Sequence, residues 1–278
     1  MANIPYKLLV VDIDGTLLNK DGAISTEDKK ALSRASDSGI QVSLSTGRVT
    51  QACSKILKQL SLDGYHMFFD GALVSNPETS EEVYCQPIGE ELVRQIVEFA
   101  HLKEINVDLY SATRYFIERE TWTTDIRRNF FNLQPTVVDL TDIWHQERII
   151  KGTLVVFSAE EKAKADSFRS HFDNRLSFSL TNTPAYPGID FINVVDSEVS
   201  KGKAMEALAS FLGISVTEVM AIGDGANDVS LLSKAGLAIA MGNASDELKA
   251  VADYVTLDVD HNGVAAAIER FILQSRRV

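Results

Sequence analysis

The stretch that decides the fold is KLLVVDIDGTLL, residues 7–18. Its apolar residues run almost without interruption to Asp12 and Asp14, and Gly15 then permits a turn. Such a run is typical of a central strand that is buried on both faces in a parallel sheet. Because ligands bind beyond the carboxyl ends of strands in open α/β sheets, we expect these carboxylates at a ligand site. A solvated Asp-Gly turn is the alternative, and it explains one aspartate better than two.

The composition is that of a globular protein with a substantial core. The chain has 278 residues, 45% of them hydrophobic, and a net charge of −12. This charge argues against general binding to nucleic acids or anionic membranes. Cys53 and Cys85 are the only cysteines, so we expect neither a disulfide framework nor a cysteine-based zinc cluster. No stretch reads as a secretory signal or a membrane span, which predicts a cytoplasmic protein.

Strands and helices alternate at both ends of the chain. Beyond the first strand, the apolar pattern predicts strands at residues 40–44, 67–69, 219–222, 237–241 and 254–257, with helices between them, one ending near Ala235. The middle differs, with helices at 90–104, 121–131 and 159–172 and strands at 107–110, 114–117, 153–157, 176–180 and 190–195. We therefore predict an α/β core with a parallel sheet from residues 1–85 and 194–278, and an inserted α+β domain at 86–193.

Polar residues follow several of the predicted strands. They are Asp12 and Asp14, the segment STGR at 45–48, and the segment GDGAND at 223–228, while Lys201 begins a predicted helix. Strand ends of one parallel sheet lie at one edge, so these groups are expected to meet. Several carboxylates without a histidine or cysteine partner favour a hard cation, Mg²⁺ more than Zn²⁺.

The same residues suit phosphoryl chemistry. Thr46 and the backbone N–H groups at the start of a helix can hold a phosphate, and Lys201 adds a compact positive charge. A carboxylate beside Mg²⁺ can attack phosphorus, and a second can protonate the leaving group and later activate water. Taken alone, STGR is an ordinary helix entry, Lys201 a solvated lysine and Gly223-Asp224-Gly225 a tight turn.

Together these motifs resemble a known family. DIDGTL at 12–17, STGR at 45–48, SKG at 200–202 and GDGAND at 223–228 are similar to the four ordered motifs of the haloacid dehalogenase-like (HAD) hydrolases. IAMGNA at 239–244, ADYVT at 252–256 and NGV at 262–264 resemble the Cof-type subgroup. The resemblance implies a doubly wound, Rossmann-like parallel-sheet core with an α+β cap of class IIB inserted between the second and third motifs.

The resemblance also implies roles for single residues. Asp12 would be the nucleophile and a Mg²⁺ ligand. Asp14 would be the general acid and base, with its backbone carbonyl on the metal. Thr46 and Lys201 would hold the phosphoryl group, assisted by the N–H of Gly47.

The last motif supplies the remaining site residues that the resemblance implies. Asp224 would be the main further metal ligand. Asn227 and Asp228 would support the loop, with Asn227 assigned to the phosphate and Asp228 to the metal. Two residues depart from the subgroup: Asp70 stands where asparagine is common, and Asn193 where glutamate is frequent. Asp70 either adds negative charge near the entrance, which would disfavour very acidic substrates, or is simply a turn residue.

These observations predict a Mg²⁺-dependent phosphatase of small phosphorylated metabolites, with sugar phosphates as the expected class, acting through an aspartyl-phosphate. The inserted domain would set specificity, with basic candidates at Arg114, Arg119, Arg127, Arg128 and Lys151. A phosphomutase is one alternative, and a non-enzymatic phospho-acceptor switch is another. Receiver-type switches carry an adjacent acidic pair after the first strand and the acceptor on a later strand, so the D-x-D pattern favours an enzyme.

Overall fold

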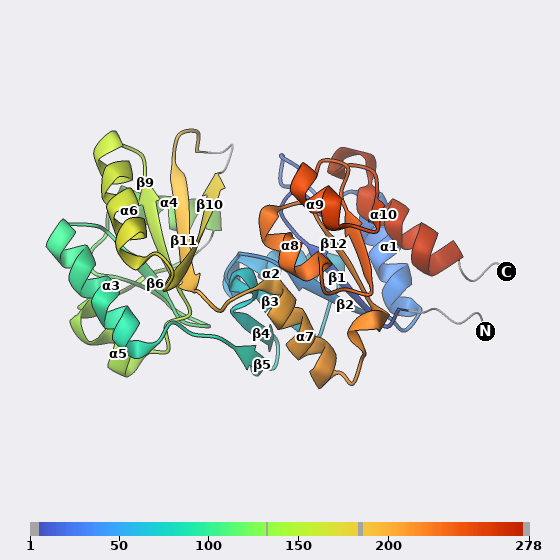
Figure 1. The fold of residues 1–278 in the computed structure, drawn as a ribbon, viewed down its shortest axis with the longest axis horizontal. Helices are drawn as coiled ribbons and strands as arrows, with labels where there is room; N and C mark the ends of the chain where they lie inside the picture. Colours follow the sequence, from blue (N-terminus) through green and yellow to red (C-terminus); the bar gives the residue numbers. More distant parts are fainter. Residues whose placement is uncertain (1–5, 132, 183–185, 275–278) are drawn as a thin grey trace. The chain divides into compact units, whose positions relative to one another are not determined.

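The computed structural model describes residues 6–131, 133–182 and 186–274. These residues form two compact units (Figure 1). The core unit contains Met1–Arg48, Ser54–Tyr84 and Ser200–Val278, and the inserted unit contains Val49–Cys53 and Cys85–Val199. The assignment of 1–85 with 194–278 and of 86–193 to separate domains stays a prediction.

The core unit is built on an eight-stranded sheet of order β14-β13-β12-β1-β2-β3-β4-β5. The strands are β1 (Leu8–Asp12), β2 (Gln41–Ser45), β3 (His66–Phe68), β4 (Leu73–Asn76), β5 (Glu81–Cys85), β12 (Val219–Gly223), β13 (Leu237–Ala240) and β14 (Tyr254–Val255). The six strands from β14 to β3 pair in parallel, and β4 runs antiparallel to β3. The α/β fold with a parallel sheet, predicted from the sequence, is therefore confirmed.

β1 lies at the centre of this sheet, between β2 and β12 (Figure 1). All five of its residues are buried, as the apolar run predicts. Asp12, the last of them, is opposite Ser45 of β2 in the register. Segments from the two ends of the chain thus form one continuous sheet.

Helices cover both faces of the core sheet. They are α1 (Thr26–Asp37), α2 (Thr50–Leu60), α7 (Lys201–Phe211), α8 (Val229–Leu232), α9 (Asp246–Val251) and α10 (Gly263–Ile268), which continues into a π-helical turn at Glu269–Leu273. The β1–α1–β2 and β12–α8–β13 crossovers run in opposite directions across the sheet. Because such crossovers are right-handed, α1 and α8 lie on opposite faces, which makes the core doubly wound.

Short helical turns complete the core unit. They are η1 (Phe69–Gly71), η3 (Val216–Glu218), η4 (Ala226–Asp228) and η5 (Val259–His261). The helix expected to end near Ala235 is shorter, because the Ser233 hydroxyl donates a hydrogen bond to the Val229 carbonyl at 2.7 Å. Such a local bond competes with continued helix. The exposed edge strand β5 was not expected, since its residues EEVYC lack the apolar run of the inner strands.

The inserted unit is a six-stranded sheet of order β10-β11-β9-β6-β7-β8 with helices packed on it. Its elements are α3 (Glu90–Lys103), β6 (Asp108–Tyr110), β7 (Tyr115–Ile117), α4 (Trp122–Phe131), β8 (Thr136–Val137), η2 (Leu140–Asp142), α5 (Ile143–Gln146), β9 (Lys151–Val156), α6 (Ala159–Phe172), β10 (Leu176–Asn182) and β11 (Asp190–Asp196). All pairs except β7–β8 are antiparallel. Leu109, Phe116 and Val194 share a core with Phe168 and Phe172 of α6, so one sheet face is closed by helices.

Candidate active site

The carboxyl ends of β1, β2 and β12 bring together segments that are far apart in the sequence. Asp12 ends β1, Thr46 follows β2 and Asp224 follows β12. Lys201 begins α7, where the N-cap Ser200 accepts a hydrogen bond from the Lys203 N–H. All of these residues belong to the core unit. The sheet therefore places the predicted nucleophile, phosphate-binding and metal-binding residues at one edge.

Lys201 is a buried cation held between two carboxylates. Its Nζ lies 2.6 Å from Asp12 Oδ1 and 2.6 Å from Asp228 Oδ1, and only 1% of the residue is exposed. Burial alone lowers the pKa of Lys201, but the negative charges of Asp12 and Asp228 outweigh it and hold the pKa above its usual value. Lys201 is therefore charged at neutral pH.

Three carboxylates form an acidic cluster around this lysine. Asp12, Asp224 and Asp228 each place one oxygen within 4.8 Å of the others. Burial raises the pKa of Asp12 well above its usual value, although Lys201 opposes the shift. Burial likewise raises the pKa of Asp224 to about 6, despite a hydrogen bond from Thr16. Burial therefore disfavours the ionised forms of Asp12 and Asp224 in the absence of a further positive charge.

Asp228 supports the loop that carries Asp224. It is fully buried, its Oδ1 accepts from Lys201, and its Oδ2 accepts from the N–H groups of Asp224 at 3.1 Å and Gly225 at 3.0 Å. Both carboxylate oxygens thus have protein donors. This geometry fits the supporting role that the resemblance gives it, more closely than that of a principal metal ligand.

Residues near Asp224 that the sequence did not single out fix its carboxylate. The Thr16 hydroxyl donates to Asp224 Oδ1 at 2.8 Å, and Asn243 Nδ2 lies 2.8 Å from the Gly15 carbonyl and 3.4 Å from Asp224 Oδ2. A Cβ at position 15 would lie 2.2 Å from Asp224 Oδ2, and the φ of Gly15 is +88°. Only glycine permits this close approach. Thr16 and Asn243 lie in the segments DGT and MGNA, which belong to the sequence motifs DIDGTL and IAMGNA. The sequence does not show that both side chains contact Asp224.

Asp14 lies apart from the acidic cluster. Its side chain is about half exposed, at 55%, and its carboxylate accepts two hydrogen bonds from the Arg48 guanidinium. The sequence suggested a phosphate-binding role for the backbone N–H of Arg48 but no role for its side chain. In the structure it is the direct partner of the predicted general acid and base.

The Thr46–Gly47 loop lies against a second turn. Thr46 is buried, its N–H donates to the Met67 carbonyl at 3.0 Å, and its Oγ1 accepts from the Arg48 N–H at 3.1 Å. Asp70, in the turn after β3, accepts a hydrogen bond from Asn227 Nδ2 at 2.9 Å. Thr46, Gly47 and Asn227 are thus neighbours of Asp70 at the same edge of the core sheet.

The basic candidates of the inserted unit have acidic or polar partners within that unit. These pairs are Arg114–Glu147, Arg119–Asn106, Arg127–Asp108 and Arg128–Glu120. Arg127 and Asp108 are both buried, with Nε and Oδ2 3.3 Å apart. Lys151 is also buried. The arginines that looked like ligand contacts in the sequence are therefore engaged in ion pairs and hydrogen bonds of the protein itself.

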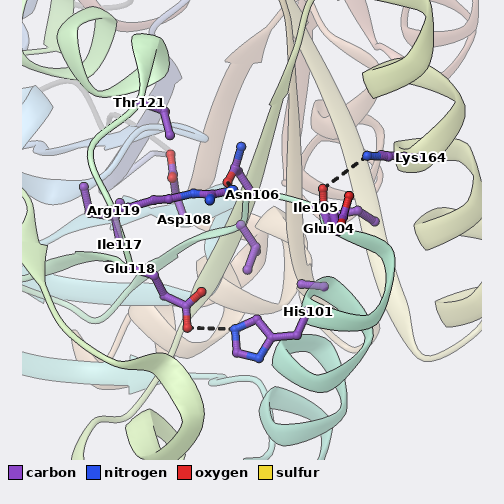
Figure 2. Close-up of a pocket in the computed structure, with 12 residues that line it drawn as sticks. His101, Glu104, Ile105, Asn106, Asp108, Ile117, Glu118, Arg119, Thr121 and Lys164 are labelled. Carbon is purple, nitrogen blue, oxygen red and sulfur yellow. Dashed lines mark hydrogen bonds and ion pairs between the residues drawn. The ribbon is translucent and has the colours of Figure 1, made fainter.

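The inserted unit also contains a pocket of about 630 Å³ beside the end of α3 (Figure 2). His101 Nε2 lies 2.7 Å from Glu118 Oε1 there, and Lys164 Nζ donates to the Glu104 carbonyl at 3.5 Å. These polar groups of the pocket lining thus form hydrogen bonds with one another. The acidic cluster and the buried lysine, by contrast, lie in the core unit.

The donor set of the acidic cluster fits a divalent cation. Oxygen ligands from several carboxylates are those that hard cations prefer, and a cation would offset both the burial and the mutual repulsion that raise the pKa values of Asp12 and Asp224. Beside such an ion, a buried lysine and a buried threonine can stabilise the negative oxygens of a phosphoryl group.

Within the described part of the chain, no helix has the length and apolar character needed to cross a bilayer.

A family model for haloacid dehalogenase-like hydrolases matches residues 9–268. Phosphatase YwpJ of Bacillus subtilis is 28% identical over 286 aligned residues, covering 96% of this chain and 100% of YwpJ. A second B. subtilis relative, the 5-amino-6-(5-phospho-D-ribitylamino)uracil phosphatase YcsE, is 27% identical and covers 98% of both chains.

Solved structures show the same likeness. A haloacid dehalogenase-like hydrolase from Bacteroides thetaiotaomicron superposes with a TM-score of 0.81 at 29% identity, covering 96% of this chain and 100% of that one. The HAD subclass IIB sugar phosphatase BT4131 superposes with a TM-score of 0.74 at 25% identity, covering 95% and 98% of the two chains.

Proposed function

Because the chain belongs to the haloacid dehalogenase-like hydrolases and is a phosphatase of the Cof type, we propose that it hydrolyses small phosphorylated metabolites through an aspartyl-phosphate on Asp12, with Mg²⁺ as cofactor. Sugar phosphates are the proposed substrate class. The observation that carries the proposal is the buried Lys201, 2.6 Å from both Asp12 and Asp228, beside the carboxylate of Asp224.

In the first step, a carboxylate oxygen of Asp12 attacks the phosphorus of the ester. The bond from phosphorus to the ester oxygen breaks as the new bond to Asp12 forms, and the leaving oxygen takes a proton from Asp14. Lys201 favours the ionised form of Asp12, and with Thr46 it stabilises the charge on the transferring phosphoryl oxygens.

In the second step, water attacks the phosphorus of the aspartyl-phosphate. Asp14, now ionised, takes a proton from that water, and the bond from Asp12 to phosphorus breaks. Inorganic phosphate leaves, and both carboxylates return to their starting states. Arg48 must move away from Asp14 before that carboxyl group can hand a proton to the substrate, because its guanidinium donates to both carboxylate oxygens.

Asp12, Asp224 and the backbone carbonyl of Asp14 would hold Mg²⁺, with Asp228 fixing the loop. When bound, the ion would supply positive charge that screens Asp12 from the phosphoryl oxygens and lowers the barrier to attack. Thr16 and Asn243 would orient Asp224 toward it.

The sugar-phosphate class rests on the relatives and on the anionic character of the chain. BT4131 is described as a sugar phosphatase, and YcsE acts on a phosphoribityl compound, which is the phosphate ester of a polyhydroxylated carbon chain. A net charge of −12 also disfavours polyanionic partners such as nucleic acids.

Phosphate release from a panel of phosphate monoesters tests the proposal. The panel includes sugar phosphates, polyol phosphates and phosphorylated carboxylates, each assayed with MgCl₂ and with excess chelator. We expect release that requires Mg²⁺ and is fastest with a sugar or polyol phosphate. Asp12→Asn is expected to be inactive, whereas Asp63→Asn, which removes the same charge from the exposed loop before β3, keeps full activity.

Three results would contradict the proposal. Full activity in chelator would remove the Mg²⁺ requirement. Activity of highly purified Asp12→Asn would remove the nucleophile. A phosphoryl group passed to a second hydroxyl of the substrate, or retained on Asp12 without turnover, would instead indicate a phosphomutase or a phospho-acceptor switch.

A further inference from the structure

The turn after β3 has an unusual backbone. Phe69, Asp70 and Gly71 have φ values of 54°, 57° and 95°, so three successive residues are left-handed. This conformation is unfavourable for Phe69 and tolerable for an aspartate, and it persists only where the surroundings impose it. Here the Phe69 N–H donates to the Arg48 carbonyl at 3.1 Å, and the Asp70 N–H donates to the Thr46 carbonyl at 3.0 Å. The turn is thus bonded to both ends of the Thr46–Arg48 loop.

The conformation directs the Asp70 carboxylate at the phosphate-binding residues. A Cβ at Gly47 would lie 2.8 Å from Asp70 Oδ1 and 3.0 Å from Oδ2, so the carboxylate touches the Gly47 backbone. Asp70 Oδ1 also accepts the hydrogen bond from Asn227. The negative charge of Asp70 is among those that raise the pKa of Lys201. One carboxylate therefore contacts Gly47 and Asn227 and acts through its charge on Lys201, the groups to which the family resemblance gives phosphoryl contacts.

The second oxygen of the Asp70 carboxylate, Oδ2, is buried and accepts no hydrogen bond from the described residues. A buried carboxylate oxygen without a donor costs stability, so its presence calls for a functional reason. A turn residue alone would not require the charge, because asparagine adopts the left-handed conformation equally well and accepts the same bond from Asn227.

We propose that Asp70 limits how tightly the active site retains the phosphoryl anion, so that inorganic phosphate leaves quickly after each turnover. This inference rests on the proposed function. A fixed negative charge beside Gly47 and Asn227 repels the phosphate dianion. An ester substrate gains further contacts through its organic part, but the phosphate product does not, so the repulsion bears most heavily on the product.

Direct binding of inorganic phosphate, measured by isothermal titration calorimetry in MgCl₂, tests the role of Asp70. Asp70→Asn removes the charge and keeps the turn and the Asn227 bond. We expect it to bind phosphate about tenfold more tightly than the unchanged protein, for a charge a few ångströms from a dianion. Steady-state assays should show a matching decrease in the inhibition constant of phosphate. The control Asp63→Asn lies at the opposite end of β3 and should bind phosphate as the unchanged protein does.

A structural defect cannot imitate the expected result, because damage to the turn would weaken phosphate binding. Asp70→Ala provides this comparison, since it loses both the charge and the acceptor for Asn227. Equal phosphate affinity, within twofold, for folded Asp70→Asn and the unchanged protein would overturn the inference while leaving hydrolysis intact. If the unchanged protein hydrolyses no ester but Asp70→Asn binds phosphate more tightly than it does, the proposed function would be overturned and the role of Asp70 supported. Absence of phosphate binding in every protein would overturn the inference about Asp70, because Asp70→Asn is expected to bind phosphate more tightly, and the hydrolysis assay alone would then decide the proposed function.

Discussion

The Arg48 guanidinium donates two hydrogen bonds to the Asp14 carboxylate, with Nε 2.8 Å from Oδ2 and Nη2 2.5 Å from Oδ1. Arg48 comes from the segment that follows β2, and Asp14 from the segment that follows β1. A bidentate pair of this kind fixes the plane of the carboxylate as well as its charge. The structure therefore holds the carboxylate of the predicted general acid and base outside the acidic cluster, with both of its oxygens bonded to Arg48.

Asp14→Asn tests the proton transfer that we assign to this residue. The amide oxygen can still accept from Arg48, but the side chain can neither donate a proton to the leaving group nor take one from water. We expect kcat to fall by about 10²–10⁴-fold. Because the second step needs the base, phosphoryl groups should accumulate on the peptide that contains Asp12, which mass spectrometry after rapid acid quenching would detect. An unchanged kcat would reject the acid and base role.

Lys201→Met tests the balance of charge around the buried lysine. The substitution keeps most of the side-chain volume but leaves Asp12 and Asp228 buried without their cation. Removing one partner of a buried ion pair typically costs about 3–5 kcal/mol. We expect a loss of this size in the free energy of unfolding by urea in chelator, together with loss of activity. The matched control is Lys58→Met on the exposed side of α2, which should unfold like the unchanged protein. Equal stability of the two variants would show that Lys201 does not compensate the cluster.

The sequence predicted the frame of the site better than its contacts. The apolar run before Asp12 was enough to predict a buried central strand, and the fold around it is confirmed. The Arg48–Asp14 pair could not be predicted from the sequence. The motifs STGR and DIDG indicate only that each residue follows a strand, and they do not indicate that the two side chains meet. The relative placement of the two side chains depends on strand order and loop conformation.

Asp70 shows a second limit of the sequence. The dipeptide Asp70-Gly71 predicts a turn, but it does not reveal that Phe69 is also left-handed or that the carboxylate touches Gly47. These features arise from backbone hydrogen bonds to the Thr46–Arg48 loop, which is distant in sequence. In the inserted unit, the basic residues offered as ligand contacts have partners in the protein for the same reason: periodicity places a residue on a face without showing what that face meets.

Asp224 predicts how the metal ion and pH together affect stability. Burial raises its pKa to about 6 in the folded state, so between roughly pH 4 and pH 6 the folded protein binds more protons than the unfolded chain. In chelator, the contribution of Asp224 to the free energy of unfolding should therefore decrease as the pH rises through this window. Mg²⁺ needs the ionised carboxylate, so the increase in Tm on adding MgCl₂ should be small at pH 5 and several degrees at pH 7.5. Equal increases at both pH values in thermal unfolding would contradict this assignment, and Asp224→Asn should abolish the increase.

His66 predicts a separate loss of stability in acid. It is fully buried on β3, and its Nδ1 accepts a hydrogen bond from the Leu44 N–H at 3.1 Å. Burial lowers the pKa of His66 to about 4 in the folded state, whereas the unfolded chain binds this proton near pH 6.5. The stabilising contribution is complete above pH 6.5 and is lost as the pH falls toward 4, by roughly 3 kcal/mol in all. His66→Asn offers an oxygen acceptor to Leu44 without titrating, so its urea-unfolding free energy should vary less over this range. His145→Asn, on an exposed side chain, should leave the pH dependence unchanged, and an equal acid slope in all three proteins would refute the assignment.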